Sequence, residues 1–237
     1  NNFLKLYNKF CPGPITFVLK LKKNSKISKI VTNNKKTLAA RFPGHKTIRN
    51  LLNTLSFPLA APSANISSKV SAVKVSDVKE DFCKKIKFIL NGGKSKIGLE
   101  STIVDLTKSP KILRLGGVEV SKIEKILKKK IKISISPKKL KAPCQMHLHY
   151  SPGIPLKMNV NKKKKNEAFI VFRKKTTKQL NTFYLSKNKS LSEAARNLYS
   201  VLRKIKNKGF KSIAVEKIPN IGIGQSINDR LKRASKF

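Results

Sequence analysis

The sequence predicts an α/β protein made of two folded domains and a linker, and three observations support this fold class. First, strand-like runs alternate with runs of helical periodicity along residues 1–130. Second, residues 131–166 interrupt the alternation with four prolines and a run of lysines. Third, residues 167–237 show strand, helix, strand, turn and helix signals in the order typical of a small Rossmann-like parallel sheet. These three ranges are the predicted first domain, linker and second domain.

The elements of the first domain follow from composition and spacing. Helices are indicated by apolar residues three and four positions apart and by capping residues: Ser76 with Asp77 for one helix, and Ser121 with Glu124 as the capping box of another. Strands are indicated by β-branched, aromatic or alternating residues. The predicted helices cover 3–10, 46–55, 76–85 and 121–130, and the predicted strands cover 15–22, 36–42, 87–91, 102–107 and 111–115.

The second domain has clearer signals. Ser190 and Glu193 form a capping box at the start of a long predicted helix. Gly209 stands where a C-terminal glycine cap would end this helix. The apolar positions of that helix lie on one face. Strands are predicted at 168–173, 182–186 and 212–216, and a last helix at 225–236 after the turn Gly222-Ile223-Gly224.

The composition is strongly basic. The chain of 237 residues has 54 Lys and Arg against 11 Asp and Glu, which gives a formal net charge of +43. Such a charge is typical of nucleic-acid partners, and contact with tRNA is left open. However, only eight of the basic residues are Arg. Because phosphates and base edges favour the guanidinium fork, so large an excess of Lys is better explained by the base composition of the genome.

The cysteines and the apolar runs of the sequence indicate in which cellular compartment we expect the protein. Cys11, Cys83 and Cys144 are odd in number and widely spaced, which favours a reducing cytoplasm over a disulfide framework or a zinc site. No run of about 18 apolar residues occurs, so we expect no membrane partner.

The first candidate site residue is Arg41, which interrupts an apolar strand shortly after Thr37 and just before Pro43-Gly44. An arginine at a strand end suits bidentate capture of a carboxylate or phosphate. The alternative is a surface ion pair, although acidic partners are scarce in this chain.

Three further groups lie in loops beside predicted strands. Ser63 and Asn65 follow an apolar run, Ser101 follows Gly98, and Arg114 precedes two glycines. Hydroxyl, amide and guanidinium groups in such positions can bind phosphate oxygens or a base edge. Ordinary turn chemistry is the alternative for each group.

His147, His149 and Tyr150 stand together in the linker. No cysteine or acid lies at ligand spacing from the two histidines, so a metal site is not predicted. A histidine or tyrosine that packs over a ligand is the better interpretation.

Taken together and in this order, these groups resemble the threonylcarbamoyl-AMP synthase family: a YrdC-like domain, here in the long form with a linker and a C-terminal extension domain. The resemblance covers nearly the whole chain, and only the combination of motifs is specific. The motifs are CPGPITFVL (11–19), LAARFPGH (38–45), PLAAPSAN (58–65), GLESTIVD (98–105), ILRLGG (112–117), HYSPGIPL (149–156), EAARNLYSVLR (193–203) and GIGQSINDRLKRAS (222–235).

The resemblance implies a fold and a reaction. The YrdC-like domain is a twisted mixed-sheet α/β fold around a basic cavity. The enzyme class is a nucleotidyltransferase that joins L-threonine, bicarbonate and ATP, with Mg²⁺ bound to the ATP, into threonylcarbamoyl-AMP and pyrophosphate. A downstream threonylcarbamoyl transferase then modifies tRNA.

The resemblance also implies roles for single residues. Arg41 is expected to hold the carboxylate of threonine, with Ala61 and Ser101 nearby. His149 is expected to help Tyr150 close over the nucleotide. The expected ATP contacts are Thr37, Ser63, Asn65, Ser71, Arg114 and Tyr150.

The scarcity of acidic residues fits this chemistry. Threonine and bicarbonate give a carbamate, which is already anionic and attacks the α-phosphorus without a strong general base. We therefore expect no catalytic side chain as such, and expect catalysis by positioning and charge stabilisation.

The sequence departs from the family pattern in three places. Cys11 replaces a usual tryptophan, and Cys144-Gln145 replaces a usual Gly-Met pair. The Lys-x-Arg-Pro and Pro-Thr-x-Thr-x-Tyr-Gly-Leu motifs that precede the Pro-Gly-Pro block in the family are absent. We therefore expect that a front segment is missing and that this chain alone has little activity.

Two alternatives remain at this point. The chain could be a non-catalytic RNA-binding protein that keeps the basic cavity, or a pyrophosphate-releasing enzyme that uses another amine. An RNA binder has no need to keep Ser101, Arg114 and Tyr150 together, and the C-terminal motifs argue against another substrate.

Overall fold

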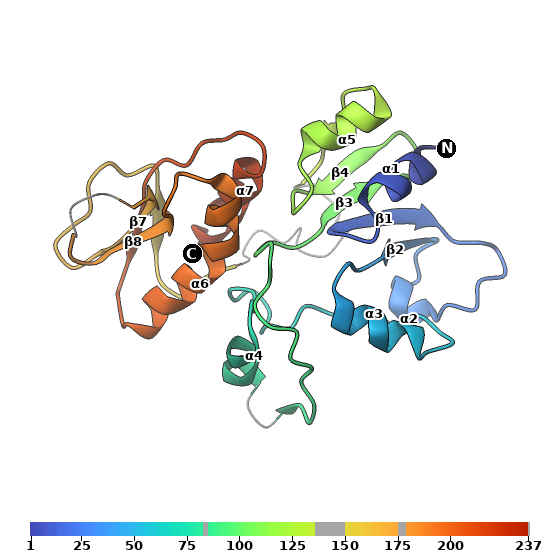
Figure 1. Cartoon of the computed structure of the whole chain (residues 1–237), viewed down its shortest axis with the longest axis horizontal. Helices are drawn as coiled ribbons and strands as arrows, with labels where there is room; N and C mark the ends of the chain where they lie inside the picture. Colours follow the sequence, from blue (N-terminus) through green and yellow to red (C-terminus); the bar gives the residue numbers. More distant parts are fainter. Residues whose placement is uncertain (83–84, 136–149, 175–178, 237) are drawn as a thin grey trace. The chain divides into compact units, whose positions relative to one another are not determined.

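The computed structural model describes residues 1–82, 85–135, 150–174 and 179–236 and divides the chain into two compact units (Figure 1). The first unit contains residues 1–62 and 100–146, and the second contains residues 63–99 and 147–237. The second unit therefore includes residues 63–99, which the sequence analysis placed in the first domain. Arginine side chains from residues 191–207 bind this segment, which explains why it belongs to the second unit and not to the first.

A five-stranded mixed sheet is the centre of the first unit, with strand order β2-β1-β3-β4-β5. β1 is antiparallel to β2 and parallel to β3, and β3 is antiparallel to β4. Most strand and helix predictions for this unit are confirmed. The strands are β1 (Ile15–Lys20), β2 (Thr37–Arg41), β3 (Thr102–Asp105), β4 (Lys111–Arg114) and β5 (Lys132–Ile133), and the helices are α1 (Asn2–Phe10), α2 (Lys29–Thr32), α3 (Lys46–Asn53) and α5 (Val120–Leu127).

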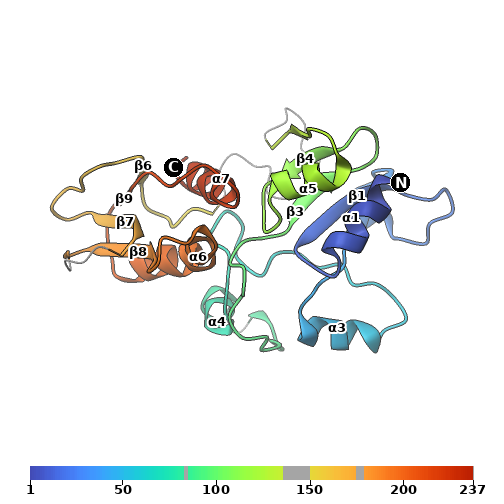
Figure 2. The ribbon, with the colours of Figure 1, turned by 45° about the horizontal axis from the view of Figure 1, so that its top comes forward.

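Helices α1 and α5 lie side by side on one face of this sheet (Figures 1 and 2). Leu6 of α1 and Ile123 of α5 are fully buried there against Phe17, Val104 and Ile112 of the strands. Burial of large apolar side chains contributes about 1.5–3 kcal/mol each, so this cluster is the main source of stability in the first unit.

The second unit is built on a four-stranded, fully parallel sheet with strand order β6-β9-β7-β8. This confirms the Rossmann-like prediction. α6 packs on β8 and α7 packs on β6, and α4 lies next to α6 in both views (Figures 1 and 2). The strands are β6 (Leu156–Met158), β7 (Ala168–Arg173), β8 (Thr182–Ser186) and β9 (Ile213–Val215), and the helices are α4 (Val75–Phe82), α6 (Leu191–Asn207) and α7 (Gly224–Ala234).

The predicted linker, 131–166, is partly incorporated into the two sheets. β5 extends the sheet of the first unit through its pairing with β4, and β6 extends the sheet of the second unit through β9. Residues 136–149 lie outside the described residues, and with them the sequence interpretations for Cys144, His147 and His149.

Three local predictions are wrong. Ser76 does not cap its helix, because α4 begins at Val75 and Ser76 already lies inside it. Residues 87–91 form no strand, and Phe88 and Leu90 in this segment are 89% and 62% exposed. The capping box of α5 is also absent, because the helix begins at Val120, so that Ser121 already lies in its first turn. Glu124 acts at the other end of the helix, where its Oε1 accepts a hydrogen bond of 3.0 Å from the Ile131 amide.

Ser190 caps α6 as predicted, since its side chain accepts a hydrogen bond from the Glu193 amide. The Glu193 carboxylate turns towards β8 and accepts hydrogen bonds from the Ser186 hydroxyl (2.6 Å) and the Lys187 amide (3.0 Å). These bonds, led by the one from Ser186, lower the pKa of Glu193 from its ordinary value of 4.5.

We predict a pH-dependent contribution of Glu193 to stability. Because folding lowers its pKa, the stabilisation is fully present above pH 4.5 and is lost as the pH falls through the lower pKa of the folded state. In urea unfolding, the stability difference between the unaltered protein and Glu193→Gln should therefore shrink on acidification below that value. Ser186→Ala should reduce this dependence, and parallel pH profiles of the unaltered protein and Glu193→Gln would contradict the assignment.

In the part of the chain that the structure describes, no helix is both long enough and apolar enough to cross a membrane.

Candidate functional site

A row of directly paired residues crosses four strands of the first sheet. Arg41 on β2 pairs with Thr16 on β1, Thr16 pairs with Ile103 on β3, and Ile103 pairs with Arg114 on β4. Directly paired residues point to the same face of a sheet. Thr16 alternates with Ile15 and Phe17, which face α1 and α5, so the whole row faces away from these helices.

An irregularity in the pairing of β3 with β4 determines the face of the sheet to which the Arg114 side chain points. Ile103 pairs with Arg114, but the next residue, Val104, pairs with Ile112, so Leu113 is the extra residue of a β-bulge. With strict alternation, Arg114 would share the face of Ile112 and point into the apolar cluster. The bulge instead places its guanidinium on the same face as Thr16. The sequence gives no signal for this bulge.

Ser101 links the row together. Its hydroxyl lies 2.6 Å from the Thr16 hydroxyl and accepts a hydrogen bond of 2.9 Å from Nη2 of Arg114. The Nε of Arg114 also donates to the Ser101 carbonyl at 3.0 Å. The sequence analysis selected Ser101 and Arg114 but missed Thr16, because a single threonine in an apolar strand is common.

The glycine pair after β4 fixes the backbone around Ser101. The Gly117 amide donates to the Glu100 carbonyl at 2.9 Å. A Cβ on Gly116 would lie 2.4 Å from that carbonyl oxygen and 2.5 Å from the Thr102 amide nitrogen, so only glycine fits. The motifs GLESTIVD (98–105) and ILRLGG (112–117) are therefore packed closely against each other.

The electrostatics of this row favour an anion. Desolvation of its guanidinium and, secondarily, the like charge of Arg114 lower the pKa of Arg41. Arg41 forms no ion pair with the residues that the structure describes. An anion between the two guanidinium groups would relieve their repulsion and accept charge-assisted hydrogen bonds from both. This arrangement fits a carboxylate or a phosphate.

The remaining residues predicted for the first unit lie elsewhere in it. Thr37 pairs with Lys20, at the opposite end of β2, about 13 Å along the strand from Arg41. The structure does not bring Thr37 to Arg41. Ala61 is exposed in the irregular segment that leads out of the first unit.

A second group of predicted residues lies in the second unit, around residues 65–71. We call these residues the 65–71 loop. Asn65 is 7% exposed, and its Nδ2 donates to the carbonyls of Ile66 (2.9 Å) and Lys69 (3.2 Å). Among the described residues, its Oδ1 has no hydrogen-bond partner. A buried amide oxygen without a partner costs about 1–3 kcal/mol, which indicates that a ligand or water satisfies it.

Tyr150 lies beside this loop and is fully buried. Its ring stacks on Tyr199 of α6 with centroids 5.6 Å apart, and the guanidinium of Arg230 of α7 lies 5.0 Å from its centroid. The adjoining Ser151 amide donates to the Ser68 carbonyl at 2.8 Å, so the linker and the loop are directly attached. Ser63 is exposed, and Ser71 is buried at the end of the loop.

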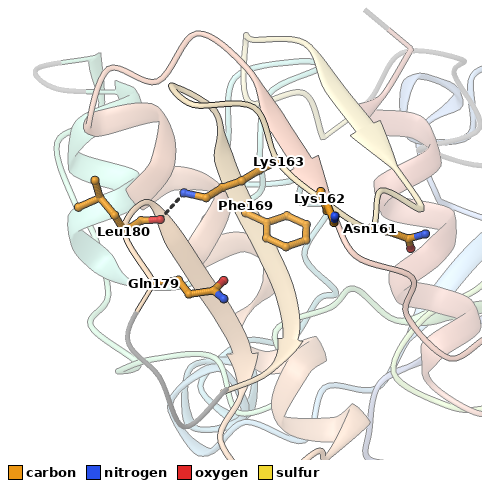
Figure 3. Close-up of a pocket in the computed structure, with 6 residues that line it drawn as sticks. All are labelled: Asn161, Lys162, Lys163, Phe169, Gln179 and Leu180. Carbon is orange, nitrogen blue, oxygen red and sulfur yellow. Dashed lines mark hydrogen bonds between the residues drawn. The ribbon is translucent and has the colours of Figure 1, made fainter.

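A cavity in the second unit lies apart from these residues (Figure 3). It has a volume of about 520 Å³, and the side chain of Lys163 closes one side by donating to the Leu180 carbonyl. None of the predicted site residues lines it; the lining residues are Asn161, Lys162, Lys163, Phe169, Gln179 and Leu180.

The described residues contain no group of three or more His, Cys, Asp or Glu side chains that could hold a metal ion. The donors around Ser101 are hydroxyl and guanidinium groups, which suit anions. They fit the phosphates of a Mg²⁺–ATP complex better than a bare cation.

The mixed sheet with its row of Arg41, Thr16 and Arg114, followed by a parallel α/β unit, defines a two-part α/β protein with a candidate anion site. Two family models match the chain. The model described as "Telomere recombination" matches residues 1–116, and the model described as "Threonylcarbamoyl-AMP synthase, C-terminal domain" matches residues 118–236.

Curated relatives give the same assignment. Threonylcarbamoyl-AMP synthase of Pyrococcus abyssi is 33% identical over 98% of this chain and 73% of its own length. The Bacillus subtilis protein of the same name is 29% identical over 97% of this chain and 72% of its own length. The chain thus spans about three quarters of these relatives.

Solved structures agree with this result. The crystal structure of P. abyssi Sua5 complexed with L-threonine has a TM-score of 0.86 and 32% identity and covers 97% of this chain and 72% of the other. A double variant of the same P. abyssi protein has a TM-score of 0.85 and 31% identity and covers 99% of this chain and 73% of the other. The chain belongs to the threonylcarbamoyl-AMP synthase family, in the long form with a C-terminal domain, a family of nucleotidyltransferase enzymes.

Proposed function

We propose that this protein forms threonylcarbamoyl-AMP and pyrophosphate from L-threonine, bicarbonate and ATP, for the threonylcarbamoyladenosine modification of tRNA. The observation that carries the proposal is the row of Arg41, Thr16 and Arg114, in which Ser101 contacts Thr16 and Arg114, together with the family assignment. The crystal structure of a relative complexed with L-threonine supports threonine as the substrate.

In this proposal Arg41 binds the carboxylate of threonine. The amine of threonine condenses with bicarbonate to a carbamate and releases water, and a carbamate oxygen then attacks the α-phosphorus of ATP. The P–O bond to the β-phosphate breaks, and pyrophosphate leaves. Arg114 and the Ser101 hydroxyl stabilise the negative charge on the reacting groups.

Each unit is assigned its own nucleotide contacts, as the family resemblance implies. In the first unit, Arg114 is assigned to phosphate oxygens. In the second unit, the assigned contacts are Ser63, Asn65, Ser71 and Tyr150. Asn65 Oδ1 is an acceptor, so the group of ATP assigned to it is a donor: a ribose hydroxyl or the adenine amine. Mg²⁺ bound to ATP would supply neutralisation of the phosphate charge, and no protein carboxylate is assigned to it.

The partners beyond the substrates follow from the product. A mixed anhydride is labile, so a downstream threonylcarbamoyl transferase must consume it. We place the reaction in the cytoplasm, where the free thiol of Cys11 would remain reduced. Burial raises the pKa of this thiol, and this further limits its reactivity.

The test is a mass-spectrometric assay of the full-length protein for threonylcarbamoyl-AMP with ¹³C-bicarbonate, together with pyrophosphate release. Ser101→Ala should lower kcat/KM by about tenfold or more, because Nη2 of Arg114 loses its hydroxyl acceptor and the Thr16 hydroxyl loses its hydrogen-bond partner. Thr107→Ala is the matched control and should retain activity. It also removes a hydroxyl group, one that donates to the Asp105 carboxylate just after β3. Binding of RNA without any ATP- and threonine-dependent product would favour the non-catalytic alternative.

A further inference from the structure

Residues 63–99 are held in the second unit by side chains of α6. The Nε of Arg196 donates to the Lys96 carbonyl at 2.9 Å, and the Lys94 ammonium lies 3.4 Å from the Asn197 side-chain oxygen. About two helical turns further along α6, Arg203 binds the other end of the same segment. The C-terminal domain therefore determines how this segment is arranged.

Arg203 is the most highly coordinated of these side chains. Its Nη1 and Nη2 donate to the two carboxylate oxygens of Asp81 at 3.2 and 2.5 Å, and Glu80 lies 3.8 Å away. The side chains of Arg203 and Asp81 are only 9% and 6% exposed. This is a bidentate, buried ion pair, a geometry that lysine cannot reproduce.

The same guanidinium also binds the backbone of the 65–71 loop. Nη2 donates to the Val70 carbonyl at 2.8 Å, and Nε donates to the Ser71 carbonyl at 3.4 Å. The loop is thus fixed at one end by the Asn65 amide and at the other by Arg203. Between these ends, the Lys69 amide donates to the Ile66 carbonyl at 3.1 Å.

We propose that Arg203 is a positioning residue for nucleotide binding: the C-terminal domain uses it to hold the 65–71 loop in the shape that presents Asn65 and Ser71 to ATP. The inference rests on the proposed function. Arg203 does not need to touch the nucleotide, because its hydrogen bonds to two loop carbonyls transmit the position of α6 to the loop.

The experiment compares Arg203→Lys with Arg196→Lys in the whole protein. Both changes keep the charge on α6, but only the first removes the fork that binds Asp81 and the loop carbonyls. We expect Arg203→Lys to raise KM and Kd for ATP about tenfold, the effect of one charge-assisted hydrogen bond, and to leave the KM for threonine unchanged. Arg196→Lys should change neither constant.

Asp81→Asn is the second variant, in case Arg203→Lys does not fold. It removes the charge of the carboxylate that binds the Arg203 guanidinium, and it leaves Arg203 and both loop carbonyls in place. A smaller increase in KM and Kd for ATP is therefore expected. Melting temperatures confirm that each variant is folded.

Unchanged ATP constants in the folded variants, or an equal increase for ATP and threonine, would overturn the inference. Calorimetric titration with ATP separates this inference from the proposed function. Failure of the unaltered protein to bind ATP overturns both, whereas ATP binding without product formation contradicts the proposed function alone.

Discussion

Replacement of Arg41 by alanine is expected to lower kcat/KM for threonine by about 10- to 150-fold, the effect of losing one hydrogen-bonded charge pair. Arg41 lies in one row with Thr16 and Arg114, and without it the carboxylate of threonine loses the guanidinium group that is assigned to it. The KM for ATP should change much less. Steady-state kinetics with each substrate varied in turn measure this difference.

Arg49→Ala is the matched control, since Arg49 is an exposed arginine of the helix that follows β2. Arg41→Lys should recover only part of the activity, because an ammonium group cannot make the bidentate contact. An unchanged dependence on threonine concentration in Arg41→Ala would refute the assignment of Arg41 to the carboxylate.

The second large effect is expected for Gly98→Ala, which should destabilise the protein by about 2–5 kcal/mol. Gly98 has a φ of +77°, and a Cβ there would lie 2.4 Å from the Cα of Arg196 and 2.5 Å from the Ala195 carbonyl oxygen. These atoms belong to the backbone of α6, so they cannot rotate away. Both the unfavourable φ and the overlap contribute to the loss.

Gly93→Ala separates the two causes. Gly93 has the same φ of +77°, but a Cβ there would meet nothing within 4 Å. This variant should therefore lose only about 1–2 kcal/mol, the cost of the left-handed conformation. Urea unfolding of both variants measures the difference, and equal losses would mean that Gly98 does not pack closely against α6.

Much of the fold could be predicted because local signals and long-range packing agree. The apolar and aromatic runs at 168–173 and 182–186 and the cap at Ser190 predicted the parallel second sheet and α6 nearly as the structure has them. The strand predicted at 87–91 failed because its apolar residues find no neighbouring strand among the described residues, and propensity alone does not form a sheet.

The candidate site could be predicted only in part. Arg41, Ser101 and Arg114 were selected by residue type and position beside glycines, and the structure brings them together. Thr16 joins them through strand register, which a sequence does not display. The contact of Arg203 with the 65–71 loop spans more than 130 residues and carries no local signal at all.

That separation has a consequence for synthesis on the ribosome. The 65–71 loop emerges early, but the helix that holds it, α6, is translated more than 100 residues later. A nascent chain of this protein therefore passes through a long period in which the first sheet can form while the loop assigned to the nucleotide is unsupported. Ribosome-bound chains stalled before and after α6 should differ in protease sensitivity at residues 63–99, and the capacity to bind ATP should arise late in translation.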